Sequence, residues 1–372
     1  MTLPEQPVVG IVGSAGAYGR WLCRFFQQQM GLAVIGHDPA DPDSASPQAV
    51  LGAADVLVFS APIRHTPDII AQWVALSAGR ESGQLWLDVT SVKMAPVSAL
   101  LQSCAEVVGL HPMCAPPKSP SLQGRVLVVC PARLSRWRGW VDRLCAALQT
   151  QCVVSEPQRH DRIMALVQAM VHAGGLAQAG VMRQYVDRLD GMAGLMAFRT
   201  VGFELDVAVI ARILALNPAI YEDIQFGNPY VAEMLGHFSA QLQRLHALVL
   251  AGDQAARTAF RQEFLQASAT AFGAERVAEG NYSFERLGYL LADLAGERAV
   301  SVYLPQDRPG SLRSLLALFE EAGINLSSIH SSRTPEGALH FRLGLEGALD
   351  ASVLVSVLAQ VDASGIGQVL PS

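Results

Sequence analysis

The chain has 372 residues, of which 51% are hydrophobic and 16% charged, and its formal net charge at pH 7 is −6. This length allows two or three domains, and the apolar content excludes global disorder. The small negative charge, without blocks of like charge, argues against a nucleic-acid-binding protein and against a polybasic membrane contact.

Short runs rich in Val, Leu and Ile alternate with helical segments over residues 1–155. Strands are predicted at 8–12, 32–36, 56–60, 84–88, 106–110 and 125–130. These runs do not alternate apolar and polar residues, which is typical of strands covered on both faces of a parallel sheet. The pattern predicts a Rossmann-type, doubly wound α/β domain.

From 156 to 295 the periodicity becomes helical. Helices are predicted at 158–188, 192–217, 228–251, 253–278 and 283–295, divided by Gly, Asn and Pro stops. The most apolar stretch, 163–182, carries Gln168, His172 and Gln178, which favours a buried bundle helix over a membrane span. We therefore predict an all-α domain.

The last segment, 296–372, returns to alternation on a smaller scale. Its pattern is β-α-β-β-α-β, which predicts a ferredoxin-like unit.

Six cysteines all lie within the first 152 residues, without a C-x-x-C pair or metal-like spacing to histidine. No basic leader precedes the first strand, so we expect a cytoplasmic protein with reduced thiols and no bound metal. Cys114 lies in a stretch that carries other candidate residues, but we expect no chemical role for it.

A glycine-rich turn, GSAGAYG, follows the first strand and opens a helix. A dinucleotide site needs such a turn, because the pyrophosphate approaches the backbone closely at a helix N-terminus. The last two glycines have the fingerprint spacing, whereas the first position falls either to Gly13, with one extra residue, or to Ser14. The residues assigned to the cofactor here are Gly13, Ser14, Gly16, Ala17, Tyr18 and Gly19.

Asp38 follows the second predicted strand, 25 residues after Gly13. A carboxylate there can accept hydrogen bonds from the adenosine ribose hydroxyls and repels a 2′-phosphate, which favours NAD over NADP. The alternative is a plain βα turn with an incidental acid.

Two polar motifs, LDVTSVK and GLHPM, each follow a predicted strand of the same sheet. Ligands bind at the carboxyl ends of parallel strands, so Ser91 and His111 are candidates for one cleft. A neutral His111 imidazole can accept a proton from a substrate hydroxyl, and Ser91 can share that hydroxyl or orient the ring. Lys93 is either a contact to an anionic group or an exposed loop lysine.

Two polar residues interrupt apolar helical faces in the second domain. Arg212 is expected to be buried and therefore needs a carboxylate partner, either Asp206 or a ligand. His172 reads as a core histidine or as a ligand contact.

Several blocks in order along the chain resemble the prephenate dehydrogenase family. They are IVGSAGAYGR, VFSAPIRHT, LDVTSVK, GLHPMCAP, RHDRIMALVQAMVHA and ARILALNPAIYEDI. The resemblance implies oxidative decarboxylation of prephenate to 4-hydroxyphenylpyruvate, with hydride transfer to NAD, on the path to tyrosine. We also assign Ser60 and Pro62, in the second block, to the cofactor site.

In that family the histidine of the H-P-M block binds the ring hydroxyl and assists its deprotonation, and His111 holds that position here. Ser91 matches the serine that contacts the same hydroxyl. Arg212 matches the arginine that binds a substrate carboxylate, and His172 matches a histidine beside the substrate. Glu204 stands where some relatives carry a second arginine, so no role is carried over to it.

The segment 307–333 resembles an ACT domain, a module that pairs across subunits and binds amino acids. This implies feedback by tyrosine, or else a module used only for assembly. A homodimer is expected. No chorismate mutase-like segment precedes the first strand, so a monofunctional enzyme is expected. The competing functions are arogenate dehydrogenase, 4-amino-4-deoxyprephenate dehydrogenase and a catalytically inactive nucleotide-binding regulator.

Overall fold

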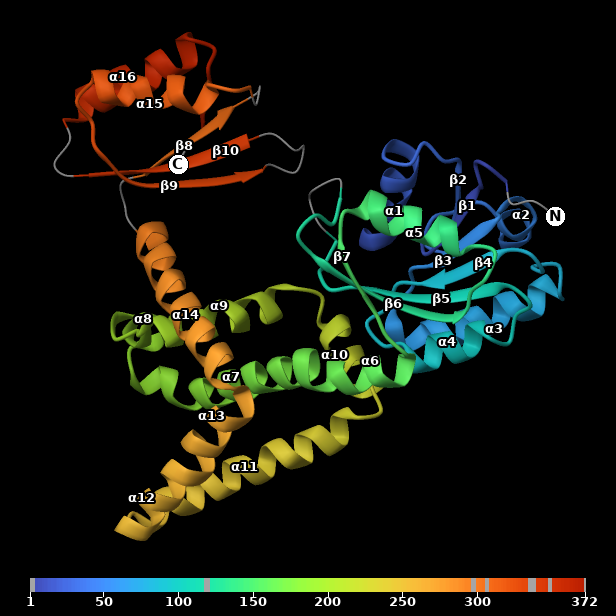
Figure 1. Ribbon diagram of the computed structural model, residues 1–372, viewed down its shortest axis with the longest axis horizontal. Helices are drawn as coiled ribbons and strands as arrows, with labels where there is room; N and C mark the ends of the chain where they lie inside the picture. The colour runs from blue at the N-terminus through green and yellow to red at the C-terminus, as the bar shows by residue number, and fades with distance from the viewer. Residues whose placement is uncertain are drawn as a thin grey trace. The chain divides into compact units, whose positions relative to one another are not determined.

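The computed structural model describes residues 4–116, 121–295, 299–304, 308–333, 339–346 and 350–370. The chain divides into two compact units, 1–244 and 245–372, which are described separately (Figure 1).

A seven-stranded sheet organises the N-terminal part of the first unit, in the order β2-β1-β3-β4-β5-β6-β7. The strands are β1 (Val9–Val12), β2 (Val34–His37), β3 (Val56–Phe59), β4 (Leu85–Asp88), β5 (Glu106–Pro112), β6 (Val126–Arg133) and β7 (Gln151–Val154). The first five strands are parallel, β6 pairs antiparallel with β5, and β7 runs parallel to β6. All six predicted strands are present, and the exposed edge strand β7 was not predicted.

Helices cover both faces of this sheet, as the doubly wound pattern predicts. Figure 1 shows α1 (Ala17–Gln28) and α5 (Arg138–Leu148) on one face, with α3 (Thr66–Ser77) and α4 (Met94–Leu100) on the other. The short helix α2 (Pro47–Ala53) joins the second group. Each face has its own buried apolar cluster: Phe25, Phe26 and Trp140 belong to the first, and Trp73, Val97 and Leu100 to the second. Burial of each such side chain contributes roughly 1.5–3 kcal/mol.

The chain after β7 is helical as far as residue 295. The helices are α6 (Pro157–Met164), α7 (Val171–Tyr185), α8 (Gly191–Ala197), α9 (Val201–Ala215), α10 (Pro218–Gly227), α11 (Val231–Ala251), α12 (Gln254–Phe260), α13 (Ala267–Phe272) and α14 (Ala274–Ala295). Two π-helical segments, Ala165–Met170 and Arg261–Gln266, interrupt the run.

Local chemistry explains where these helices depart from the sequence prediction. The predicted helix 192–217 is two helices, because the Thr200 side chain accepts the Phe203 N–H at 3.2 Å and starts α9 afresh. The predicted helix 253–278 ends before Gly273, whose φ of +82° is left-handed. Helix α10 was missed, although Asn217 caps it by accepting the Ala219 N–H at 3.1 Å.

The helical run Pro157–Arg188 is long and apolar enough to cross a membrane by length and composition alone, and 22% of its most apolar stretch is buried. The prediction that residues 163–182 form a buried bundle helix is therefore wrong for a single chain, in which most of this stretch is exposed. Exposed apolar side chains along this run include Leu166, Val167, Val171 and Val181.

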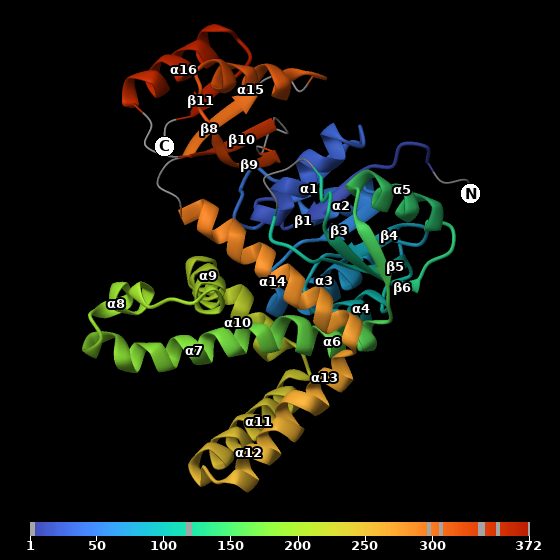
Figure 2. The same cartoon turned by 60° about the vertical axis from the view of Figure 1, so that its left-hand side comes forward.

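The second unit contains a four-stranded antiparallel sheet in the order β11-β8-β10-β9. Its elements are β8 (Ala299–Leu304), α15 (Ser311–Glu321), β9 (Leu326–Arg333), β10 (Leu339–Leu345), α16 (Ala351–Ala363) and β11 (Gln368–Leu370). Figure 2 shows α15 and α16 on the same face of the sheet, where Phe319 and Val361 join one core. The predicted β-α-β-β-α-β order is confirmed. The domain boundaries at 155 and 295 stay a prediction.

Candidate active site

The turn after β1 requires glycine at the first position of the motif. Gly13 has φ of +89°, and a Cβ there would overlap the Ser60 carbonyl oxygen. The Gly13 carbonyl oxygen packs against Gly19, and a Cβ at Gly19 would overlap this oxygen. Gly13, rather than Ser14, therefore fills the position that only glycine tolerates, and Ser60 at the end of β3 lies directly against this turn.

Helix α1 begins immediately after the turn with its first N–H groups available to an anion. Gly16 is the N-cap and provides no side-chain acceptor, and the first turn, which begins at Ala17, contains no acidic residue. Pro62 is farther along the same sheet edge, where its carbonyl accepts the Thr66 hydroxyl at 3.0 Å. The close-packed glycines and the uncapped helix start fit a pyrophosphate.

Asp38 follows β2 and lies against the same turn. Its Oδ2 accepts the Ala15 N–H at 3.0 Å, and its Oδ1 accepts the Ala40 N–H at 2.9 Å. This holds a carboxylate beside the turn at the carboxyl end of a strand, as ribose recognition requires. Tyr18, which was also predicted to contact the cofactor, is half-buried in α1. Burial, together with the neighbouring Cys114 thiol, raises the pKa of Tyr18, so its hydroxyl stays neutral.

His111 lies near the carboxyl end of β5 and is buried with 2% of its surface exposed. Its Nδ1 is 2.9 Å from Nε2 of His160 in α6, and Nδ1 of His160 is 2.7 Å from Oδ1 of Asp161. Burial lowers the pKa of His111 well below the usual value, and the nearby Lys93 ammonium group lowers it further. His111 is therefore neutral at pH 7, as a general base must be.

The Asp161 carboxylate ties this histidine pair to the sheet edge. Its Oδ1 accepts the backbone N–H of Lys93 at 2.8 Å, and its Oδ2 accepts that of Met94 at 2.9 Å. Its own carbonyl accepts the Asn228 side-chain amide at 2.7 Å. Helix α6 and the N-terminus of α4 are thereby fixed relative to each other around His111.

Lys93 is fully buried, so the expectation of an exposed loop lysine is wrong, and its ammonium group points inward. The ammonium group pairs with Asp88, which is also fully buried, and donates to the Leu110 carbonyl at 2.8 Å. Gly109 makes room for this pair: a Cβ there would lie 3.0 Å from Lys93 Cδ and 3.2 Å from Asp88 Oδ2. Lys93 therefore supports the strand that carries His111.

The remaining predicted residues lie on the loop after β4 and on the helices. Ser91 is partly exposed at the sheet edge that carries His111. The expectation that Arg212 is buried is wrong, because α9 buries Ile210 and Ile213 and leaves the guanidinium exposed. Burial raises the pKa of the Cys114 thiol, and the Tyr18 hydroxyl, Arg125 and Arg212 oppose that rise.

His172 is half-buried in α7, and its ring meets Tyr221 of α10 edge-on with centroids 4.8 Å apart. Burial lowers its pKa. Its Nδ1 is buried without a hydrogen-bond partner among the described residues, which is unusual for a core histidine and leaves a group for a ligand to satisfy.

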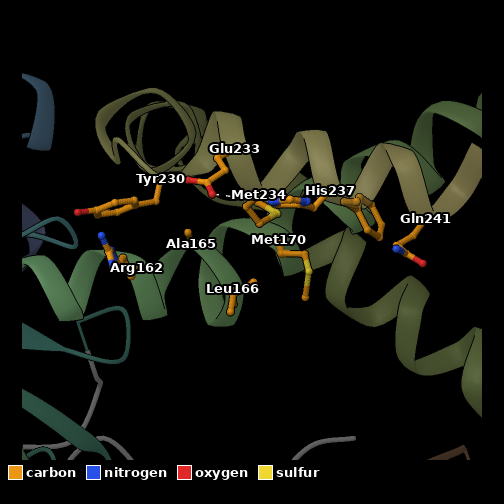
Figure 3. Close-up of a pocket in the computed structure, with 10 residues that line it drawn as sticks. Arg162, Ala165, Leu166, Met170, Tyr230, Glu233, Met234, His237 and Gln241 are labelled. Atoms are coloured by element: carbon orange, nitrogen blue, oxygen red, sulfur yellow. Dashed lines mark ion pairs between the residues drawn. The ribbon is translucent and has the colours of Figure 1, made fainter. Parts of the chain in front are cut away.

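A separate groove of about 490 Å³ contains none of the predicted site residues. Figure 3 shows it between the start of the helical run at α6 and helix α11, with Arg162 and Tyr230 at one end and Gln241 at the other. The Arg162 guanidinium lies 5.0 Å from the centre of the Tyr230 ring. Elsewhere the lining is mostly apolar, as at Met170 and Met234. The groove is an open, mostly apolar surface between helices.

Among the described residues, no group of three or more His, Cys, Asp and Glu side chains could hold a metal ion.

Three family models match the chain. They are "Prephenate dehydrogenase, nucleotide-binding domain" over 39–152, "Prephenate dehydrogenase, dimerization domain" over 156–264 and "ACT domain" over 298–363. The nucleotide-binding model begins at residue 39, after the glycine turn. The assignment of the cofactor residues before residue 39 is therefore supported by the geometry of the turn and not by this match.

Curated relatives agree with these models. A probable arogenate/prephenate dehydrogenase of Methanocaldococcus jannaschii is 24% identical over 306 residues, which are 77% of this chain and 66% of that protein. The T-protein of Enterobacter agglomerans is 28% identical over 68% of this chain and 65% of its own length. The chain thus spans just under two thirds of both relatives. A 4-amino-4-deoxyprephenate dehydrogenase of Streptomyces pristinaespiralis is 32% identical over 66% of this chain and 85% of its own length.

Among solved structures, the prephenate dehydrogenase of Aquifex aeolicus in complex with hydroxyphenyl propionate and NAD+ has the same fold. It superposes with a TM-score of 0.56 at 19% identity, over 73% of this chain and all of that one.

Proposed function

The chain belongs to the prephenate dehydrogenase family, and from that premise we propose that it converts prephenate to 4-hydroxyphenylpyruvate with NAD in tyrosine biosynthesis. The observation that carries the proposal is the buried, neutral His111 at the carboxyl edge of the sheet, with its Nδ1 engaged by His160 at 2.9 Å. The engaged Nδ1 leaves Nε2 as the ring atom that can take a proton from a hydroxyl.

NAD, when bound, supplies the acceptor for the hydride. The Gly13 turn and the N-terminus of α1 would hold its pyrophosphate, and Asp38 would accept the ribose hydroxyls. Ser60 lies against the turn and would contact the same cofactor. A 2′-phosphate would face the Asp38 carboxylate, which is the reason for preferring NAD over NADP.

In this mechanism His111 accepts the proton of the ring hydroxyl as hydride leaves the carbon that bears it. Ser91 shares that hydroxyl and orients it toward the imidazole. The exposed guanidinium of Arg212 binds a substrate carboxylate, which suits its planar pair of donors. His172, with its unsatisfied Nδ1, contacts the substrate from the helical side. Loss of CO₂ needs no additional base, since aromatisation of the ring drives it.

Arogenate and 4-amino-4-deoxyprephenate remain alternatives, because they differ from prephenate at one amino group or one ring substituent and relatives of both kinds match. A regulator that binds nucleotide without catalysis is the third alternative. The test is NADH or NADPH formation with each of the three substrates and with NAD or NADP. We expect turnover with prephenate and NAD. If only arogenate or only 4-amino-4-deoxyprephenate is turned over, that compound is the substrate instead of prephenate. If no combination of substrate and cofactor is turned over, the result favours the nucleotide-binding regulator.

We further propose that the ACT domain binds tyrosine and lowers activity. The support is the match over 298–363 together with the βαββαβ fold of that segment. Tyrosine titration should give inhibition that excess prephenate does not relieve. Purely competitive inhibition that is unchanged after deletion of 297–372 would leave the domain with an assembly role only.

We propose that the protein is a homodimer and that it is located in the cytoplasm. The dimerization-domain match covers the helical run whose Leu166, Val167 and Val171 are exposed in one chain. A second copy would bury these side chains and the groove of Figure 3. Sedimentation equilibrium should give twice the chain mass of 39.8 kDa.

A further inference from the structure

The second histidine, His160, occupies a position that no function assigned above explains. It is buried with 1% of its surface exposed and lies on α6, 49 residues along the chain from the His111 ring that it contacts. The two rings meet edge-on at 68°, with centroids 5.1 Å apart. Asp161 beside it is also fully buried.

The hydrogen bonds allow only one proton arrangement for two neutral imidazoles. The Asp161 carboxylate can only accept, so Nδ1 of His160 carries a hydrogen and donates to it. Nε2 of His160 is then an acceptor, so Nδ1 of His111 must donate to it. The Nε2 lone pair of His111 is therefore free.

We propose that His160, held by Asp161, is a positioning residue that fixes the tautomer of His111 and stabilises the imidazolium that forms when His111 takes the substrate proton. This inference rests on the proposed dehydrogenase function. The transferred proton stays on Nε2 of His111, and the Nδ1–H bond to His160 shortens as the ring becomes charged. The positive charge then lies one ring away from the Asp161 carboxylate.

The other ionisable groups around His111 and His160 cannot stabilise the His111 imidazolium in place of His160 and Asp161. Lys93 and Asp88 are paired with each other. Burial raises the pKa of Cys130, on the neighbouring strand β6, to about 12, so its thiol remains neutral. Asp161 is the carboxylate that faces His160 directly.

The test compares two substitutions of His160 that differ in one acceptor. In His160→Leu nothing accepts from Nδ1 of His111, and we expect kcat to fall about 10- to 100-fold. In His160→Gln the side-chain carbonyl can accept, and we expect kcat within about fivefold of wild type. Both variants should keep wild-type NAD affinity, which checks that the nucleotide-binding region stays folded.

The pH profile separates positioning from packing. Neutral His160 accepts from Nδ1 of His111 and so stabilises the imidazolium, so His160→Leu should move the acid limb of kcat/KM to lower pH, whereas His160→Gln should keep the limb near its wild-type position and restore the plateau. Equal losses of kcat in both variants with an unmoved limb would overturn the proposal. Nitrogen-15 NMR of the histidine rings provides a readout independent of turnover. His111 should carry its hydrogen on Nδ1 in wild type, and it should be a mixture of the Nδ1–H and Nε2–H tautomers in the leucine variant. A hydrogen on Nε2 of wild-type His111 would refute the positioning role of His160 even if the protein is a dehydrogenase. If the NMR result is as expected but no substrate is turned over, only the proposed dehydrogenase activity is refuted.

Discussion

Replacing Lys93 with Met should destabilise the nucleotide-binding region strongly, because it leaves a buried carboxylate without its cation. The side chains of Lys93 and Asp88 are both fully buried. After the substitution Asp88 Oδ1 keeps the Thr90 hydroxyl at 2.6 Å, whereas Oδ2 already has no hydrogen-bond partner among the described residues. Breaking one half of a buried pair costs about 3–5 kcal/mol, a large share of the roughly 5–15 kcal/mol that stabilises a typical domain.

Tryptophan fluorescence is the appropriate assay, because all five tryptophans lie in the first 150 residues of the chain. Trp86 is fully buried on β4, the strand that carries Asp88. With a urea m-value of about 2 kcal/mol/M, the loss corresponds to a midpoint lowered by roughly 2 M.

Two control variants make this prediction specific. Asp88→Asn combined with Lys93→Met removes both charges while keeping the Thr90 contact, and it should recover more than half of the loss. Glu222→Gln breaks the exposed pair with Arg64 and should leave the midpoint unchanged. A single Lys93→Met variant that unfolds near the wild-type midpoint, or a double variant no better than the single one, would refute the reasoning.

Three further predictions concern the active site. Asp38→Ser should raise kcat/KM with NADP relative to NAD by about tenfold, because a like charge near the 2′-phosphate is removed; an unchanged ratio would mean that Asp38 does not face the ribose. Arg212→Gln should raise KM for prephenate about 10- to 100-fold with unchanged NAD affinity, as for loss of a charge-assisted bond; an unchanged KM would make Arg212 structural. The wild-type kcat/KM profile should be flat through neutral pH and fall only well below pH 6.5, because the neutral form of His111 is active and its pKa is lowered; an acid limb near pH 7 would contradict this.

The sequence predicted the elements whose patterns are local. The runs that became β1 to β6 are short and apolar because both faces of the sheet are covered, and that pattern can be read without a structure. β7 was missed because its residues are exposed at the sheet edge and carry no burial pattern. The reversed direction of β6 depends on its pairing with β5 and has no local signal.

The candidate site was predictable where a residue follows a strand and not where it depends on packing between distant segments. His111 and Asp38 follow predicted strands, so their edge of the sheet could be inferred. The contact between His111 and His160 depends on how α6 packs, although the sequence RHDR could have drawn attention to an adjacent histidine and aspartate. The burial of Lys93 depends on the missing side chain of Gly109, a long-range fit that composition does not reveal.

The most direct test of the central claim is the rate of NADH formation from prephenate by wild type and by His111→Asn, with NAD affinity measured on both by calorimetry. Asparagine cannot take the hydroxyl proton, so we predict that kcat falls by about 10²–10⁴. NAD affinity should stay within about twofold of wild type, since the cofactor turn at Gly13 follows β1 whereas His111 lies on β5. A His111→Asn variant that turns over prephenate at nearly the wild-type rate would contradict the account.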